Sequence, residues 1–405
     1  MQTFYEIVTI LFFLFQGLVA LYLLIPFFSV VVYGFIKTFS IKHPFNRRKI
    51  VHDKNFEFGI IITAHQEVEF IKPLVASILG QTYQQFYIYV VADDCDTSQL
   101  QFADPRVIIL SSQPALHAKI KSIDFARKSF IREHDITLIL DSDNLLHPDF
   151  LSVVNQHFQK GYRVVQADFK PKNEDSLYAR IDAIGDMYNF FVDREIRMMA
   201  GMSAAIWGSG ISFESALYDE IAYKTLVGGF DKKLQSTLLL KTKKIAFSTD
   251  AILYDEKVES GSSLENQRAR WMLSYFNYFK ESSKIFFTGL KTLNLDFIYF
   301  GFVLLRPPQF LLFAAAFFSL VIDFFLFRGL FYAWLVIIGL YIVSFAAIIL
   351  IRSRQIKYLK TLCMLPVFAG RQALALLKLG KASKKFLKTP HTKLVYIEDV
   401  LAKKQ

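Results

Sequence analysis

The chain has 405 residues, of which 53% are hydrophobic and 16% aromatic, and its formal net charge is +11. That amount of apolar material exceeds what a small binding module needs and is enough for one large core plus several membrane segments. The two cysteines, Cys95 and Cys363, lie far apart, which argues against a disulfide framework or a zinc site.

The basic residues gather beside apolar segments, within residues 37–49 and again within residues 352–388. Such blocks are typical of the cytoplasmic flanks of membrane helices, where they also contact anionic lipid headgroups. We therefore expect membrane lipids as partners and no nucleic acid.

The first apolar segment covers residues 7–35 and is almost uncharged. It is too long for a signal-peptide core, it lacks a small-residue cleavage site, and it exceeds the ~20 residues that span a bilayer. Residues 1–37 are thus predicted to form a transmembrane helix. Two further apolar runs, 310–327 and 330–351, predict a transmembrane hairpin over residues 309–352.

The segments around this hairpin mix apolar and charged residues. Residues 284–308 are predicted to form an interfacial helix, and residues 353–405 a basic cytoplasmic or interfacial tail, with a fourth span within 358–379 left open. Asp323 lies inside the hairpin and is expected to reach the membrane interface. The basic flanks place the domain of residues 50–283 in the cytoplasm, so the sequence predicts an integral membrane protein of the bacterial inner membrane.

The middle of the chain alternates short strands with helices. Residues 59–63 and 86–92 read as strands with a helix over 67–79 between them. A strand over 107–110, a helix over 120–130 and a strand over 137–140 follow. This alternation predicts an α/β domain with a mainly parallel sheet flanked by helices, whose ligands lie at the carboxyl ends of the strands.

Two pairs of acids follow predicted strands. Asp93 and Asp94 come after residues 86–92, where a carboxylate can accept a hydrogen bond from a base or a ribose, although a capped turn explains them equally well. Asp141 and Asp143 project to one side of an extended chain. Two such close carboxylates suit Mg²⁺ or Mn²⁺ with substrate phosphates, and the alternative is an Asp-rich turn.

Three further residues precede predicted helices. Lys119 and Lys121 stand where cationic donors meet a phosphate, or on a solvated helix face. Asp231 begins a helical stretch over residues 232–241 and serves either as a chemical group or as an N-cap.

A last group lies in a helical pattern before the membrane hairpin. Gln267, Arg270 and Trp271 are three and four residues apart and share one helix face. An amide, a guanidinium and an indole suit a diphosphate and a sugar ring. The alternative is a juxtamembrane helix with an interfacial tryptophan.

Taken in order, these residues resemble the large inverting family 2 glycosyltransferases with a GT-A domain, especially membrane synthases of cellulose, chitin, hyaluronan and poly-N-acetylglucosamine. Ceramide glucosyltransferase is a non-polymerising relative. The strand and turn over 60–67 resemble the family's nucleotide-binding opening, and Asp93 and Asp94 its nucleoside-contacting acids. Residues 141–143 resemble the DxD metal motif and residues 267–271 the QxxRW motif.

The resemblance implies that a sugar passes from a nucleotide-diphosphate donor, expected to be a UDP-sugar, with inversion. It implies Asp231 as the catalytic base and a metal at Asp143, helped by Asp141. Two residue sets complete the site. The donor side comprises Thr63, Glu67, Asp93, Asp94, Lys121, Asp141, Gln267 and Arg270, and the acceptor side Trp271, Gly208 and Ser209.

The sequence departs from the family pattern at Phe230, where Glu is usual, and at His65 and Gln66, where Tyr and Asn are common. The first departure bears on Asp231 as the base. The acceptor is expected to be a growing polysaccharide or a lipid-linked sugar. Single-sugar transfer to a lipid and a catalytically silent membrane scaffold are the alternatives.

Overall fold

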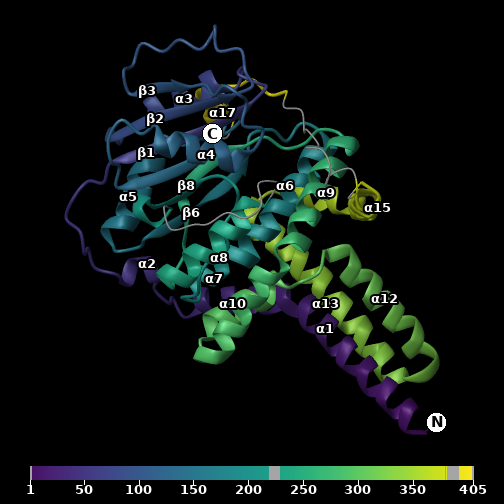
Figure 1. Ribbon diagram of the computed structural model, residues 1–405. Helices are drawn as coiled ribbons and strands as arrows, with labels where there is room; N and C mark the ends of the chain where they lie inside the picture. The colour runs from purple at the N-terminus through teal and green to yellow at the C-terminus, as the bar shows by residue number, and fades with distance from the viewer. Residues whose placement is uncertain (1, 219–228, 379, 381–391, 404–405) are drawn as a thin grey trace.

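The computed structural model describes residues 2–218, 229–378, 380 and 392–403. Figure 1 shows an α/β domain from which three long helices, α1, α12 and α13, project together on one side. The N-terminus lies at the far end of this helical arm, and the C-terminus lies beside the α/β domain.

The domain is built on an eight-stranded sheet with the order β3-β2-β1-β4-β7-β6-β8-β5. β1, β2, β3 and β4 run parallel, β6 pairs in parallel with β8, and β7 is antiparallel to both of its neighbours. The predicted α/β fold with a mainly parallel sheet is confirmed, while the reversed strand β7 was not predicted. The strands are β1 (Phe58–His65), β2 (Phe86–Asp93), β3 (Val107–Leu110), β4 (Ile136–Asp141), β5 (Leu145–Leu146), β6 (Val164–Pro171), β7 (Ile211–Glu214) and β8 (Ala246–Asp255).

The strands β1, β2 and β4 are apolar over most of their length, as expected for strands that are buried on both faces. Ile60, Ile61 and Ile62 on β1 are all fully buried. Gly59 permits a close approach, since a Cβ there would lie within 3.0 Å of Phe130 and His134 side-chain atoms. The covering helices include α3 (Ile71–Leu79), α4 (Lys119–Lys128), α5 (Phe150–Gln159), α6 (Leu177–Phe190), α7 (Ile196–Met199) and α8 (Phe230–Thr242), with a π-helical turn over Phe191–Glu195 and a 3₁₀ turn over Ser215–Leu217. α9 (Gly261–Asn277) packs mainly against other helices, including α6.

Three helices are long and apolar enough to cross a membrane: α1 (Gln2–Thr38), α12 (Gln309–Leu326) and α13 (Arg328–Ser353). They correspond to the three apolar segments predicted from the sequence. A short helix, α2 (Pro44–Arg47), follows the C-terminal end of α1.

Asp323 does not reach the surface of the helical arm, contrary to our expectation. Its side chain is fully buried between helices and accepts a hydrogen bond from Gln16 Nε2 at 3.1 Å. Gln16 Oε1 in turn accepts a bond from Trp334 Nε1 at 2.7 Å. The carboxyl group therefore joins α12 to α1 and, through Gln16, to α13 by polar bonds that the apolar pattern did not reveal.

The predicted single interfacial helix over 284–308 is divided in two. α10 (Phe279–Thr292) and α11 (Leu295–Leu304) are separated at Leu293, which has a left-handed φ of 53°. A Cβ on Gly289 would lie 2.5 Å from the Ile298 amide nitrogen, and a Cβ on Gly301 would lie 2.5 Å from the Phe286 backbone. The two glycines let the helices fold back against each other, which periodicity alone does not encode.

Buried ion pairs join the helical arm to the α/β domain. Arg352, at the end of α13, contacts Asp168 on β6 and Glu195 in the π-helical turn, with the Glu195 bond at 2.7 Å. Arg306 pairs with Asp193 at 3.0 Å. These contacts fix the end of the arm against the sheet.

The tail returns to the α/β domain. After α14 (Ile356–Thr361), a 3₁₀ turn and α15 (Leu365–Leu376), α17 (Ile397–Ala402) packs with Ile397 and Val400 against Leu145 and Tyr254. Part of the predicted basic tail, residues 381–391, lies outside the described residues, and within the rest no fourth helix long and apolar enough to cross a membrane was found.

Candidate active site

The carboxyl ends of the parallel strands bring the first acids to one edge of the sheet. β1 pairs with β2 so that His65 is opposite Asp93, and with β4 so that Thr63 is opposite Asp141. Thr63 Oγ1 donates to the Leu140 carbonyl at 3.5 Å, and Glu67 lies half-buried in the turn that follows β1.

Asp141 lies between a lysine and a glycine-containing loop. Its carboxylate forms an ion pair with Lys119, whose Nζ also donates to the Gly208 carbonyl at 2.8 Å. The Asp141 amide donates to Ser209 Oγ at 3.0 Å. Gly208 and Ser209 therefore lie beside the DxD motif, and Lys119 contacts it, while Lys121 is exposed on α4.

Asp93 is buried and holds the loop that leads to α4. Its two carboxylate oxygens accept bonds from the Leu116 amide at 2.6 Å and the His117 amide at 2.8 Å, and it pairs with His65 Nδ1 at 3.0 Å. Asp94 is exposed, with a left-handed φ of 54°, and accepts from Gln66 Nε2 at 2.7 Å. Of the two acids, Asp94 is the more accessible to a nucleoside.

The side chains of His65, Asp93 and His117 form a group whose potential ligand atoms all lie within 4.8 Å of one another. Because the Asp93 carboxylate already accepts two backbone amides, this group is better suited to holding the loop than to binding an ion.

Asp231 lies in the first turn of α8, close to the same edge. Its neighbour Phe230 packs under Lys119, with Nζ 5.1 Å from the ring centroid. Gly229 has a φ of 67°, and a Cβ there would lie 2.2 Å from Ser274 Oγ on α9. The start of α8 therefore lies between two features, the ion pair of Lys119 with Asp141 on one side and α9 on the other.

The QxxRW residues lie on α9. Burial lowers the pKa of the Arg270 guanidinium, and the charge of Asp141 acts in the opposite direction, so these two groups are close enough to interact. Gln267 Oε1 is buried and has no hydrogen-bond partner among the described residues.

Trp271 packs edge-on against Trp207, with ring centroids 5.1 Å apart and ring planes at 79°. Arg268 stacks on Trp271 at 4.2 Å, and Arg194 lies 4.9 Å from the Trp207 centroid. Trp207 was not predicted as a site residue. The sequence feature that could have identified Trp207 is its position directly before Gly208 and Ser209.

A network of hydrogen bonds underlies the DxD motif, and sequence reasoning missed it. Asn144 Oδ1 accepts from the Asp141 amide, and Asn144 Nδ2 donates to Asp255, each at 3.0 Å. Asp255 and Asp186 both pair with Lys257. Burial alone would lower the pKa of Lys257, but the adjacent carboxylates outweigh it and raise this pKa well above its usual value.

A second buried pair connects this layer to α9. Arg268 Nη2 donates to Asp182 at 2.7 Å. Burial raises the pKa of Asp182, although the charge of Arg268 opposes the rise. The second residue of the QRARW sequence thus has a carboxylate partner within the protein.

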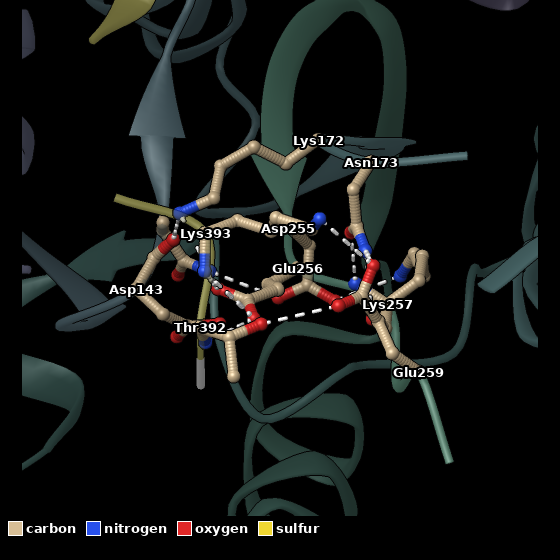
Figure 2. Close-up of polar contacts among 10 residues, drawn as sticks. Asp143, Lys172, Asn173, Asp255, Glu256, Lys257, Glu259, Thr392 and Lys393 are labelled. Carbon is tan, nitrogen blue, oxygen red and sulfur yellow. Dashed lines mark hydrogen bonds and ion pairs between the residues drawn. The ribbon is translucent and has the colours of Figure 1, made fainter. Parts of the chain in front are cut away.

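Figure 2 shows how the tail lies beside this site. Lys172 Nζ donates to the Asp143 carbonyl at 2.9 Å and lies 3.8 Å from Glu256. The Glu256 carboxylate accepts the Thr392 amide at 2.7 Å and the Lys393 amide at 3.3 Å. Residues far beyond the predicted domain boundary therefore touch the same cluster as the DxD motif.

The donor set at the end of β4 fits a hard divalent cation. Asp141 and Asp143 offer carboxylate oxygens; the Asp141 side chain is 40% exposed, so that a ligand can reach it, whereas Asp143 is buried. Both residues are anchored by the Asn144 and Lys172 contacts described above.

The model for the family described as "Glycosyltransferase like family 2" matches residues 55–274, more than half of the chain. The chain belongs to this family. The matched residues of this family 2 glycosyltransferase include the sheet, the acids at the strand ends and the part of α9 that contains Trp271. No curated protein matches the chain by sequence.

One solved structure supports the fold of the glycosyltransferase. The mannosyltransferase PcManGT from Pyrobaculum calidifontis, in complex with GDP-Man and Mn²⁺, is 13% identical, with a TM-score of 0.58 over 90% of this chain and 98% of that chain. TarS of S. aureus, residues 1–349 with UDP-GlcNAc, is 15% identical over 55% of this chain and 67% of that one, with a TM-score of 0.37.

Proposed function

We propose that this protein is an integral membrane glycosyltransferase that transfers a sugar from a nucleotide-diphosphate donor, a UDP-sugar, to a growing polysaccharide or a lipid-linked acceptor with inversion. The supporting observation is the meeting of the DxD strand end, the start of α8 and α9 at one edge of the sheet, where Arg270 interacts with the charge of Asp141. A divalent cation and a diphosphate need such a mixture of acids and a guanidinium.

On the donor side, Asp94 and Glu67 contact the nucleoside, and Arg270 and Gln267 hold the diphosphate. Gln267 would donate to the diphosphate through Nε2, because diphosphate oxygens only accept, and its buried Oε1 lacks a donor among the described residues. Lys119 positions Asp141 and the Gly208 loop rather than contacting the sugar. Asp143 and Asp141 would hold Mg²⁺ or Mn²⁺, which when bound neutralises charge that develops on the departing diphosphate.

On the acceptor side, Asp231 removes the proton from the attacking hydroxyl as that oxygen bonds to the anomeric carbon and the nucleoside diphosphate leaves. Attack opposite the leaving group inverts this carbon. Trp271 and Trp207 together form an aromatic surface for the acceptor sugar, with Gly208 and Ser209 at its edge.

The three apolar helices would anchor the enzyme, and the basic residues that follow α1 and α13 support a cytoplasmic active site at the inner membrane of a bacterium. A transferase that adds one sugar to a lipid is the second candidate. The small number of described spans favours this second candidate, since a channel that conducts a long polymer needs many membrane helices around it.

The test is to incubate the purified full chain, in lipid, with Mn²⁺ and radiolabelled nucleotide sugars. A ladder of products supports polymer synthesis, and one lipid-soluble product supports single addition. Absence of turnover and of hydrolysis with every donor would overturn the enzyme proposal and favour a scaffold.

A further inference from the structure

A second cavity lies away from the donor site, at the inner end of α1. It has a volume of about 430 Å³. Its wall includes Lys37, Ser40, Lys42, His43 and Asn46 from the segment that leaves α1, together with Glu195 from the π-helical turn.

The cavity is basic. Lys37 and Lys42 are exposed, and neither forms an ion pair with any residue that the structure describes. Glu195 is already paired with Arg352 at 2.7 Å, so it does not neutralise the lysines. The other acid that acts on this wall is Asp250, which is exposed and whose charge raises the pKa of His43.

His43 adds a neutral hydrogen-bond donor. Burial and the charge of Lys37 lower its pKa, against the effect of Asp250. Its Nδ1 accepts the Phe45 amide at 3.3 Å, so the neutral ring carries its proton on Nε2. The wall therefore offers ammonium, hydroxyl, amide and imidazole donors, a combination that suits phosphate oxygens.

The depth of the cavity relative to the bilayer decides whether its phosphate ligand comes from a lipid headgroup or from solution. The apolar span of the first helix ends at Thr38, which puts Lys37 and the following residues at the headgroup layer if α1 crosses the bilayer as proposed. Phe35 and Phe39 are exposed beside it and offer an apolar path for acyl chains.

The cavity is separate from the donor site. Phe247 and Thr249 line it from the start of β8, whereas Asp255 ends that strand next to the DxD motif. At about 3.3 Å per residue, Asp255 is up to roughly 20 Å along the strand from Thr249 and up to roughly 26 Å from Phe247. The ligand of the cavity is thus a different molecule from the donor.

We infer that this cavity binds the phosphate headgroup of an anionic membrane phospholipid and thereby fixes the inner end of α1 against the α/β domain. The inference rests on the proposed membrane insertion of α1 but not on sugar transfer, so the two are tested by separate measurements.

The experiment uses the full chain purified in detergent, with phosphatidylglycerol or phosphatidylcholine added, and native mass spectrometry to count bound lipids. We expect retention of phosphatidylglycerol over phosphatidylcholine, and at least a fivefold loss of retention in the Lys37→Gln/Lys42→Gln variant. The matched control, Lys284→Gln/Lys291→Gln, removes the same charge from exposed positions on α10 and is expected to keep the lipid.

Equal retention of both lipids, or undiminished retention of phosphatidylglycerol in the Lys37→Gln/Lys42→Gln variant, would overturn the inference. A competition arm adds an excess of inorganic phosphate. If free phosphate displaces the lipid from the wild type and raises the melting temperature of lipid-free protein by itself, the ligand is a soluble phosphate and the lipid assignment is wrong. Sugar transfer, measured in parallel, is expected to continue in both variants.

Discussion

Trp271 meets Trp207 at right angles, with 5.1 Å between ring centroids, although one residue lies on α9 and the other precedes the loop beside the DxD motif. Arginines stack on both rings, Arg268 on Trp271 and Arg194 on Trp207. The pair connects the part of the chain proposed to hold the acceptor with the part that borders the donor.

The Trp207→Ala variant should weaken acceptor binding. An edge-to-face aromatic pair contributes about 0.5–1.5 kcal/mol beyond its buried area, so we expect the acceptor KM to rise by up to roughly tenfold. Steady-state kinetics with the acceptor varied would measure this, and Trp207→Phe should recover most of the loss. An unchanged acceptor KM in Trp207→Ala would remove Trp207 from the proposed surface.

The Asp143→Asn variant should abolish metal-dependent use of the donor, because an amide is a weaker ligand than a carboxylate for Mg²⁺ or Mn²⁺. Titration of Mn²⁺ against donor hydrolysis would detect the change. Asp96→Asn, which alters an exposed acid elsewhere, serves as the control. Full activity of Asp143→Asn at ordinary metal concentrations would contradict the assignment.

The Asp231→Asn variant should keep donor binding and lose transfer. A general base contributes typically 10²–10⁴-fold to a rate, so we expect kcat to fall by at least about 100-fold while the donor Kd stays within about twofold. Calorimetry of donor binding, combined with product formation, separates the two effects. If Asp231→Asn remained fully active, the base would have to be another residue.

Lys119 and Lys121 allow a matched comparison, because they lie two positions apart on α4 and only Lys119 is seen to contact Asp141. Lys119→Gln should raise the donor KM about tenfold, since it releases both Asp141 and the Gly208 carbonyl. Lys121→Gln tests the donor-binding role predicted from sequence, and the exposure of Lys121 leads us to expect a smaller effect. A larger loss in Lys121→Gln would restore the sequence prediction.

Arg352→Met should destabilise the junction between the helical arm and the sheet. It leaves the buried Asp168 with Lys170 at 3.0 Å and removes the arginine from the half-buried Glu195, and breaking a buried pair typically costs about 3–5 kcal/mol. Arg354→Met removes the same charge from an exposed position two residues later and should change stability little. Thermal unfolding in detergent would compare them, and equal melting temperatures would show that the buried pairs contribute nothing.

Much of the fold followed from local patterns. The strand over residues 107–110 was predicted with its observed limits. The predicted ends of the other three strands differ from the observed ends by at most two residues. The helix expected from residue 67 begins instead at Ile71, because Gln66 has a left-handed φ of 61° and a turn occupies the residues between. Turn geometry of this kind is not part of hydrophobic periodicity.

The candidate site was predictable where acids follow strands and where Gln267, Arg270 and Trp271 share one face of a predicted helix. Asn144 and Lys257 carry no motif of their own, and their importance comes from the partners that folding brings to them. Likewise, the contact of Thr392 with Glu256 joins two segments whose proximity no local pattern encodes.

The sequence by itself determined which segments are apolar enough for a bilayer, which alternate as strands and helices, and which acids stand at strand ends, since each depends on residue type and spacing along the chain. Only the tertiary structure decided that Lys119 rather than Lys121 contacts Asp141, that Asp323 is buried against Gln16, and that the tail returns to the active-site edge. These are distances between segments remote in sequence, fixed by packing and by the need of buried polar groups for partners.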